Sequence, residues 1–230
     1  MSRLVLVRHG QSVWNKENRF TGWVDVPLTD LGVEEALRVG SLLKKEGIYP
    51  DIAFTSLLSR AILTTFHALS EMDRLWIPKT HSWRLNERHY GALAGLDRAS
   101  TIELYGPEKV HAWRRSYLER PPSLEDVSVF ANDPRYQNLK NWEIPKGESL
   151  KDVESRLMPF WYSSILPKLQ KDGTILIGAH GNSLRALVKN LENIGDKEVE
   201  DLEIPTGEPR LYELITRKTG HQVSPPVILR

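Results

Sequence analysis

The chain has 230 residues, 40% of them hydrophobic and 27% charged, a composition typical of a globular protein with a sizeable core. Its 31 basic and 30 acidic residues leave a formal charge of +1, so no overall field draws it to nucleic acid or to an anionic membrane. The absence of cysteine excludes disulfides, thiolate metal sites and a cysteine nucleophile. The N-terminus shows no leader pattern and no apolar run has the roughly 20 residues of a membrane span, so we expect a cytoplasmic protein.

Strands and amphipathic helices alternate along the first third of the chain. An apolar run at 3–7 predicts a buried strand. A helical pattern then extends from 28 to about 46, with Thr29 as its N-cap and Gly47 as its stop. The next predicted elements are a strand over 51–55, a helix over 56–71 and a strand over 76–83.

The middle of the chain departs from this alternation. Residues from about 86 to 145 form an irregular insertion, and its helical patterns are confined to 99–105 and 108–118. A long irregular segment inside a compact domain is more often functional than idle. Alternation resumes after 147, with a predicted long helix to about 170, a strand over 174–179, a helix over 182–192 and a final strand over 208–214.

This order of elements predicts an α/β fold in which residues 1–230 form one domain. Strands separated by helices imply right-handed crossovers and a mainly parallel central sheet with helices on both faces. In open sheets of this kind, ligands bind beyond the carboxyl ends of the strands. The residues that follow predicted strands are therefore the first place to search for a site.

Two similar stretches follow predicted strands far apart in the chain. "LVLVRHGQS" at 4–12 and "ILIGAHGNS" at 175–183 both pass from an apolar run to His, Gly, an amide side chain and Ser. Glycine lets the backbone turn sharply and approach a ligand, and the start of the following helix offers N–H groups to an anion. If the two strands are neighbours, His9 and His180 converge on one place.

The groups around these histidines indicate phosphoryl transfer. Arg8 precedes His9, and Arg60 lies just inside the helix that follows the second predicted strand. An imidazole is nucleophilic when neutral, and a guanidinium matches phosphate oxygens with a bidentate fork. A phosphoryl group in transfer mainly needs positioning and charge stabilisation, which this set supplies through a phosphohistidine and without a metal.

A general acid is offered by "RLNERHYG" at 84–91. Glu87 stands there among Arg84, Arg88 and His89, so we expect a carboxyl group held between cations where a substrate oxygen binds. Farther along, the insertion adds Arg98, Arg114 and Arg115, which is more fixed positive charge than one phosphate requires. Taken singly, a strand-end histidine is usually structural and an arginine pair is usually a solvated face; it is the combination that favours a site.

Other classes of site find no support in the sequence. The seven histidines show no HExxH or other close pair on one helix face, so a zinc site is not expected. The patterns GxxxxGK[ST], GxSxG and GxGxxG are absent. We assign Trp14, Trp23 and Trp83 to core packing, because no basic stripe accompanies them as it would in a base-stacking platform.

Six stretches together resemble one known family. They are "LVRHGQSVWNKENRFTGWVDVPLT", "FTSLLSRAI", "HSWRLNERHYG", "WRRSY", "GESL" and "AHGNSLR", in order from about residue 3 to 215. RHG by itself suggests only the histidine phosphatase superfamily. NERHYG with WRRSY is similar to the cofactor-dependent phosphoglycerate mutases within it, which implies a three-layer sandwich and interconversion of 3-phosphoglycerate and 2-phosphoglycerate in glycolysis and gluconeogenesis.

The resemblance implies roles for individual residues. His9 would carry the phosphoryl group, Glu87 would donate and accept the proton, and His180 would stabilise the transferring group beside Arg8 and Arg60. The cofactor would be 2,3-bisphosphoglycerate, which primes His9, with no metal. The substrate-binding positions would be Gly10, Gln11, Ser12, Asn15, Thr21, Gly22, Arg88, His89, Tyr90, Arg98, Arg114, Arg115, Gly181 and Asn182.

Some positions depart from the family pattern. Arg98 stands where lysine is usual and Gln11 where glutamate is commoner, whereas Glu208 and Arg210 replace apolar residues and are expected to alter the sheet edge or a subunit contact. The chain also ends at Arg230, where many relatives continue with a tail that covers the site. We expect a more open mouth, which bears on the ratio of mutase to phosphatase activity.

Two alternatives stay open at the level of sequence. The same residues would serve a bisphosphoglycerate synthase or phosphatase, and a phosphate-binding module without turnover would use part of them. Relatives form dimers or tetramers, so the resemblance implies a homo-oligomer. The interface, the regulation and the direction of flux are not disclosed by the sequence.

Overall fold

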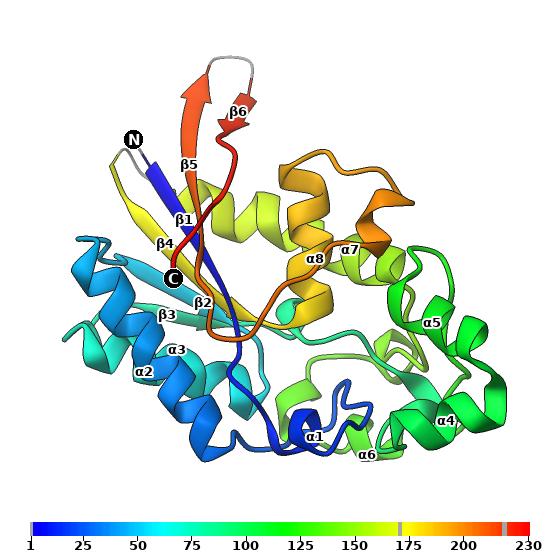
Figure 1. The fold of residues 1–230 in the computed structure, drawn as a ribbon. Helices are drawn as coiled ribbons and strands as arrows, with labels where there is room; N and C mark the ends of the chain where they lie inside the picture. The colour runs from blue at the N-terminus through cyan, green and yellow to red at the C-terminus, as the bar shows by residue number, and fades with distance from the viewer. Residues whose placement is uncertain (1, 170–171, 218–219) are drawn as a thin grey trace.

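The computed structural model describes residues 2–169, 172–217 and 220–230 and centres on a seven-stranded sheet (Figure 1). The strand order is β3-β2-β4-β1-β5-β6, and β7 pairs with β5. The strands are β1 (Ser2–Arg8), β2 (Ile52–Thr55), β3 (Lys79–His81), β4 (Thr174–Ala179), β5 (Arg210–Arg217), β6 (Gly220–Val223) and β7 (Val227–Ile228).

Pairing in the sheet divides it into two parts. The strands β3, β2, β4 and β1 are mutually parallel, whereas β5 runs antiparallel to β1 and is itself paired with β6 and β7. The mainly parallel α/β fold is confirmed. Two details were wrong: β5 is not the final strand, and Arg210 does not stand at a sheet edge, because β5 has partners on both sides and Arg210 is paired with Leu6 and Ile228.

Helices cover both faces of the sheet, which completes the three layers (Figure 1). Side chains alternate along β1: Leu4 and Leu6 pack with one helix layer, and Val5 and Val7 pack with the other, as the period of a strand requires. One layer holds α2 (Asp30–Lys45) and α3 (Ser59–Glu71), and the other holds α7 (Leu150–Phe160) and α8 (Gly181–Leu191).

The ends of α2 follow the sequence prediction. The Thr29 side chain accepts a hydrogen bond from the Gly32 N–H, and Gly47 leaves the helix with a φ of 65°. The helix predicted to continue to about 170 is broken instead. Pro159 lies inside it and lacks an N–H donor, and the chain passes at Trp161–Ile165 into a π-helix and at Leu166–Lys168 into a 3₁₀ turn; residue 170 itself lies outside the described residues.

The insertion gathers at the end of the sheet where β1 and β4 finish (Figure 1, green). The two helical patterns are confirmed as α4 (Arg98–Tyr105) and α5 (Pro107–Arg115). Phe130, Tyr136 and Ile144 bury Trp23, so this part of the insertion has its own core. The other short helices are α1 (Val13–Lys16) and α6 (Ser128–Ala131), and the 3₁₀ turns are Trp83–Leu85, Gly91–Leu93, Pro134–Tyr136, Asn141–Glu143 and Glu198–Glu200.

Helix length also bears on membranes. With 16 residues, α2 is the longest α-helix within the described ranges. None of the helices described combines the length and the apolar content needed to cross a bilayer.

The strand predicted over 76–83 is shorter than expected, since only Lys79–His81 pairs with β2.

Candidate active site

The two histidines meet because their strands are neighbours in register. Arg8 at the end of β1 pairs with Ala179 at the end of β4, so His9 and His180 leave the sheet side by side. Their ring centroids are 4.9 Å apart and both residues are almost completely buried. The convergence predicted from the two similar stretches is therefore present.

The hydrogen bonding of His9 fixes its tautomer. Nδ1 lies 2.7 Å from the carbonyl oxygen of Gly10, which only accepts, so Nδ1 carries the proton and Nε2 keeps its lone pair. Burial, followed by the charges of Arg60 and Arg8, lowers the pKa of His9 well below its usual 6.5. The ring is therefore neutral at pH 7, in the form that attacks phosphorus.

His180 presents a second polarised ring. Its Nε2 lies 2.8 Å from the Ser56 hydroxyl, whereas its buried Nδ1 has no hydrogen-bond partner within the described residues. Burial and then Arg60 and His9 lower its pKa well below 6.5. If Ser56 donates to Nε2, the unpaired Nδ1 carries a proton and is a donor for an oxyanion placed beside His9.

The two predicted guanidinium groups combine structural contacts with free donors. Arg60 donates from Nη1 to the Val24 carbonyl at 2.9 Å and from Nη2 to the Gly22 carbonyl at 2.8 Å, and Arg8 donates to the Ile204 carbonyl at 2.8 Å. The Nε atoms of both arginines are buried and unpaired in the described structure. Burial lowers the pKa of Arg60 to about 10, which still leaves it charged at pH 7.

The Glu87 carboxyl group is held by backbone N–H groups rather than by the charged side chains beside it in the sequence. Its Oε1 accepts from the Arg88 N–H at 2.8 Å and from the Asn182 N–H at 3.1 Å. The expectation that Arg84 and His89 flank the carboxyl group was wrong: Arg84 lies over the Trp83 ring, and His89 packs against aromatic rings. The charge of Arg60 reaches the carboxyl from another element of the fold.

Of these groups, His9, Arg8, Arg60 and Glu87 line one cavity of about 220 Å³. Its wall includes six arginines, and Arg114 has its pKa lowered by burial and then by Arg98. Cations that crowd one another in this way are relieved by an anionic ligand. The residues of the wall are Arg8, His9, Asn15, Thr21, Gly22, Arg60, Glu87, Tyr90, Arg98, Arg114, Arg115, Gly181, Asn182, Arg185, Glu203 and Ile204.

Thirteen of the residues singled out from the sequence line this cavity, and six do not: Gly10, Gln11, Ser12, Arg88, His89 and His180. Gly10 packs against α2, because an added Cβ would lie 2.2 Å from the Gly32 carbonyl oxygen. Ser12 caps α1, and Gln11 accepts from the Thr29 hydroxyl. The need for glycine at position 10 is thus helix packing rather than close approach to a ligand.

Of the three remaining residues outside the wall, His180 stands beside His9 as described above, and Arg88 and His89 hold the backbone of the wall. The Arg88 Nη2 donates to the Tyr90 hydroxyl at 3.1 Å and to the Arg114 carbonyl at 2.7 Å. The His89 Nδ1 accepts from the Gly91 N–H, and burial lowers the pKa of His89 to about 4. Both side chains therefore hold the segment around Glu87 and Tyr90.

Arg185 was missed from the sequence although it lines the cavity. It lies one helical turn after Asn182 on α8 and donates to the Asn182 side-chain oxygen at 2.9 Å, so the spacing within "GNSLR" was an available signal. It also donates to the Arg115 carbonyl at 2.9 Å, which ties the insertion to α8. Glu203, which contacts Arg115, carries no sequence pattern that would have marked it.

The arrangement suits transfer of a phosphoryl group to nitrogen. A neutral imidazole stands in a pocket of cations, with unpaired donors on the Nε of Arg8 and Arg60 and an unpaired Thr21 hydroxyl. One carboxyl group is fixed beside them. In the described part of the chain, no three His, Asp or Glu side chains are grouped so as to hold a metal ion.

The sequence matches known proteins along nearly its whole length. The model of the histidine phosphatase superfamily (branch 1) matches residues 4–133 and 129–223. A 2,3-bisphosphoglycerate-dependent phosphoglycerate mutase of Corynebacterium kroppenstedtii is 56% identical over 225 residues, which are 97% of this chain and 89% of that one. A protein of the same name from Lactobacillus acidophilus is 56% identical over 92% of this chain and 93% of its own.

Solved structures share the fold at lower identity. A mycobacterial glucosyl-3-phosphoglycerate phosphatase complexed with VO₃ superposes with a TM-score of 0.76 and 22% identity over 97% of each chain. An α-ribazole phosphatase from Shigella flexneri superposes with a TM-score of 0.70 and 21% identity over 96% of this chain and 94% of that one. At 21–22% identity, these two structures show a shared fold and no more.

Proposed function

Since this chain belongs to the 2,3-bisphosphoglycerate-dependent phosphoglycerate mutases within branch 1 of the histidine phosphatase superfamily, we propose that it isomerises 3-phosphoglycerate and 2-phosphoglycerate through a phosphorylated His9. It is an enzyme of the isomerase class. The observation that carries the assignment of His9 is its geometry. A neutral ring, with its proton fixed on Nδ1 by Gly10, stands beside His180 in a pocket of arginines.

His9 performs the covalent step. Nε2 attacks phosphorus, the Nε2–P bond forms, and the bond from phosphorus to the leaving oxygen breaks. The Nδ1–H bond to Gly10 keeps the ring in place as positive charge develops on it. The Nε groups of Arg8 and Arg60 and the Nδ1 of His180 then supply donors for the oxygens of the transferring group.

Glu87 handles the proton. Its carboxyl group donates a proton to the leaving oxygen, and its carboxylate later accepts one from the hydroxyl that attacks phosphohistidine. The two backbone N–H groups on Oε1 fix the orientation of the carboxyl group through both steps.

The insertion supplies side chains that would bind the anionic groups of the substrate away from the transferring phosphoryl group. Residues 86–145 supply Tyr90, Arg98, Arg114 and Arg115 to the wall, and the resemblance adds Asn15, Thr21, Gly22, Gly181 and Asn182. The surplus positive charge fits a ligand with one carboxylate and two phosphates, and buried unpaired donors such as Arg98 Nε are consistent with this. The cofactor 2,3-bisphosphoglycerate would be held there and supplies the phosphoryl group that primes His9.

An assay with 3-phosphoglycerate tests the assignment. With 2,3-bisphosphoglycerate added, we expect rapid formation of 2-phosphoglycerate with little free phosphate, and without it a much slower reaction. Both products are followed together, by NMR and by phosphate release. Release of phosphate as the main outcome would favour a phosphatase instead, and no turnover at all would favour a binding module.

We also propose a homo-oligomer, a dimer or a tetramer. Within the described sheet, β3 is an edge strand whose three residues are all exposed, and Leu63 and Phe66 of α3 are exposed as well. An unpaired strand edge can pair with a second chain, and exposed apolar side chains can take part in such a contact. Light scattering should give a multiple of the chain mass, and a value near 26.3 kDa would contradict the proposal.

A further inference from the structure

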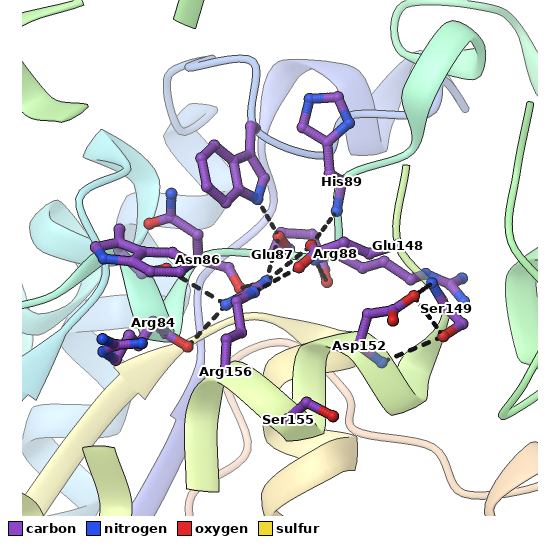
Figure 2. Close-up of polar contacts among 12 residues, drawn as sticks. Arg84, Asn86, Glu87, Arg88, His89, Glu148, Ser149, Asp152, Ser155 and Arg156 are labelled. Atoms are coloured by element: carbon purple, nitrogen blue, oxygen red, sulfur yellow. Dashed lines mark hydrogen bonds and ion pairs between the residues drawn. The ribbon is translucent and has the colours of Figure 1, made fainter. Parts of the chain in front are cut away.

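A buried ion pair lies beside the segment that carries Glu87 (Figure 2), and neither of its residues lines the cavity. Arg156 of α7 donates from Nε to Oε1 of Glu148 at 2.7 Å and from Nη2 to its Oε2 at 3.0 Å. Their side chains are 7% and 4% exposed. Removing two charges from water is costly, so such a pair is weak evidence for stability and invites a search for another role.

The Nη1 and Nη2 groups of Arg156 also donate to main-chain carbonyls of the segment from Trp83 to Glu87 (Figure 2). The Trp83 carbonyl also accepts from the Asn86 N–H, but the chain enters no strand after the 3₁₀ turn Trp83–Leu85. The buried carbonyls of Arg84, Asn86 and Glu87 therefore depend on side chains for partners. The bonds run from Nη1 to the carbonyls of Trp83 (3.3 Å) and Arg84 (2.7 Å), and from Nη2 to those of Asn86 and Glu87 (both 3.0 Å).

Glu148 holds the other side of Glu87. Its Oε2 accepts from the His89 N–H at 2.8 Å, and its own backbone N–H donates to the His89 carbonyl at 2.9 Å. The backbone is therefore bonded on both sides of the Glu87 Cα: through the carbonyls of Asn86 and Glu87, and through the amide of His89. A further bond from the Trp23 Nε1 reaches the Glu87 carbonyl at 2.7 Å.

The pair thereby controls where the Glu87 carboxyl group can lie. The side chain starts from a fixed Cα and its Oε1 is bonded to the Arg88 and Asn182 N–H groups, so few torsions remain free. A shift of the Cα would break these bonds or move the carboxyl away from the leaving oxygen. Proton transfer is sensitive to displacements of about 1 Å.

We propose that Arg156 and Glu148 are positioning residues for proton transfer by Glu87. This inference rests on the proposed roles of His9 and Glu87. When His9 attacks an alkyl phosphate, the alkoxide that leaves must take a proton from Glu87. When it attacks p-nitrophenyl phosphate, nitrophenolate leaves without one. A displaced Glu87 therefore slows the first transfer and spares the second.

The test is Arg156→Lys, which keeps the positive charge and loses the planar fork. Phosphorylation of His9 is timed by rapid quench with 2,3-bisphosphoglycerate, and by the nitrophenolate burst with p-nitrophenyl phosphate. We expect the first rate to fall by about 10- to 100-fold and the second to stay within roughly 3-fold. Equal losses with both donors, or no loss with either, would overturn the inference.

Two further variants guard the interpretation. Glu148→Gln keeps an amide oxygen for the His89 N–H and should show the same selective loss, which maintains the test if Arg156→Lys folds poorly. Arg120→Gln is the matched control, because Arg120 forms an exposed pair with Asp152 of the same helix and does not touch the segment; both of its rates should be unchanged. Failure of the parent protein to phosphorylate His9 would refute the proposed function and this inference with it, whereas equal losses in the variants of a parent that does phosphorylate His9 would overturn this inference alone.

Discussion

Replacing His9 with alanine is expected to abolish the phosphoenzyme and to lower kcat by at least about 10⁴-fold. His9 is the one histidine among the residues that line the cavity, and His180, outside this lining, has its Nε2 bonded to the Ser56 hydroxyl. The measurement is labelling from ³²P-bisphosphoglycerate, followed by a test for acid-labile, base-stable phosphate. Label that persists on the variant would refute the assignment.

The control for this variant is His81→Ala. His81 is exposed on β3, and its removal takes one imidazole from the chain without touching the cavity. Its labelling and turnover should match those of the parent. A loss as large as that of His9→Ala would mean that the assay reports something other than the nucleophile.

The His9→Ala variant also tests the lowered pKa of His9. The native ring stays neutral below pH 6.5 while the unfolded ring takes up a proton, so this group contributes stability above pH 6.5 that is lost as the pH falls. Each such ring contributes a slope of about 1.4 kcal/mol per pH unit. Urea unfolding between pH 7 and 5.5 should therefore show a shallower slope for His9→Ala, and identical slopes would contradict the pKa shift.

Replacing Glu87 with glutamine is expected to lower kcat by roughly 10²- to 10⁴-fold and to change KM only a few-fold. The amide oxygen of glutamine still accepts from the Arg88 and Asn182 N–H groups, so the geometry is retained while the proton is lost. Turnover of 3-phosphoglycerate and its affinity by calorimetry separate the two effects. A kcat within a few-fold of the parent would remove Glu87 from the chemistry.

A matched control removes a carboxylate of similar charge elsewhere. Glu103 is exposed on α4 and lies outside the wall of the cavity, so Glu103→Gln should leave both kcat and KM unchanged. Raising the acidity of the leaving group offers a second check on Glu87→Gln. Its defect should shrink with an aryl phosphate, because that leaving group departs without a proton.

Local sequence signals were sufficient to predict most of the fold. The caps at Thr29 and Gly47 and the alternation along β1 are short-range features, and the structure follows them. The strand pairing at the C-terminal end was not predicted. Two residues of β7 pair with β5, a contact decided by the path of the chain and not by any pattern within so short a strand.

The candidate site was predicted where strand ends carry it. His9, His180 and Arg60 follow β1, β4 and β2, and parallel neighbours in register bring such ends together. The contacts of Glu87 with Arg156 and Asn182 were not predicted, because these residues come from α7 and α8, far from Glu87 in the chain.

The sequence by itself determined the class of fold, the family and the identity of the groups at the strand ends, because periodicity and short motifs are properties of neighbours in the chain. The tertiary structure alone decided that the charge of Arg60 reaches Glu87 and that Arg185 and Arg156 take part. Those outcomes depend on hydrogen bonds, burial and charge between residues tens of positions apart, which only the folded chain brings within reach.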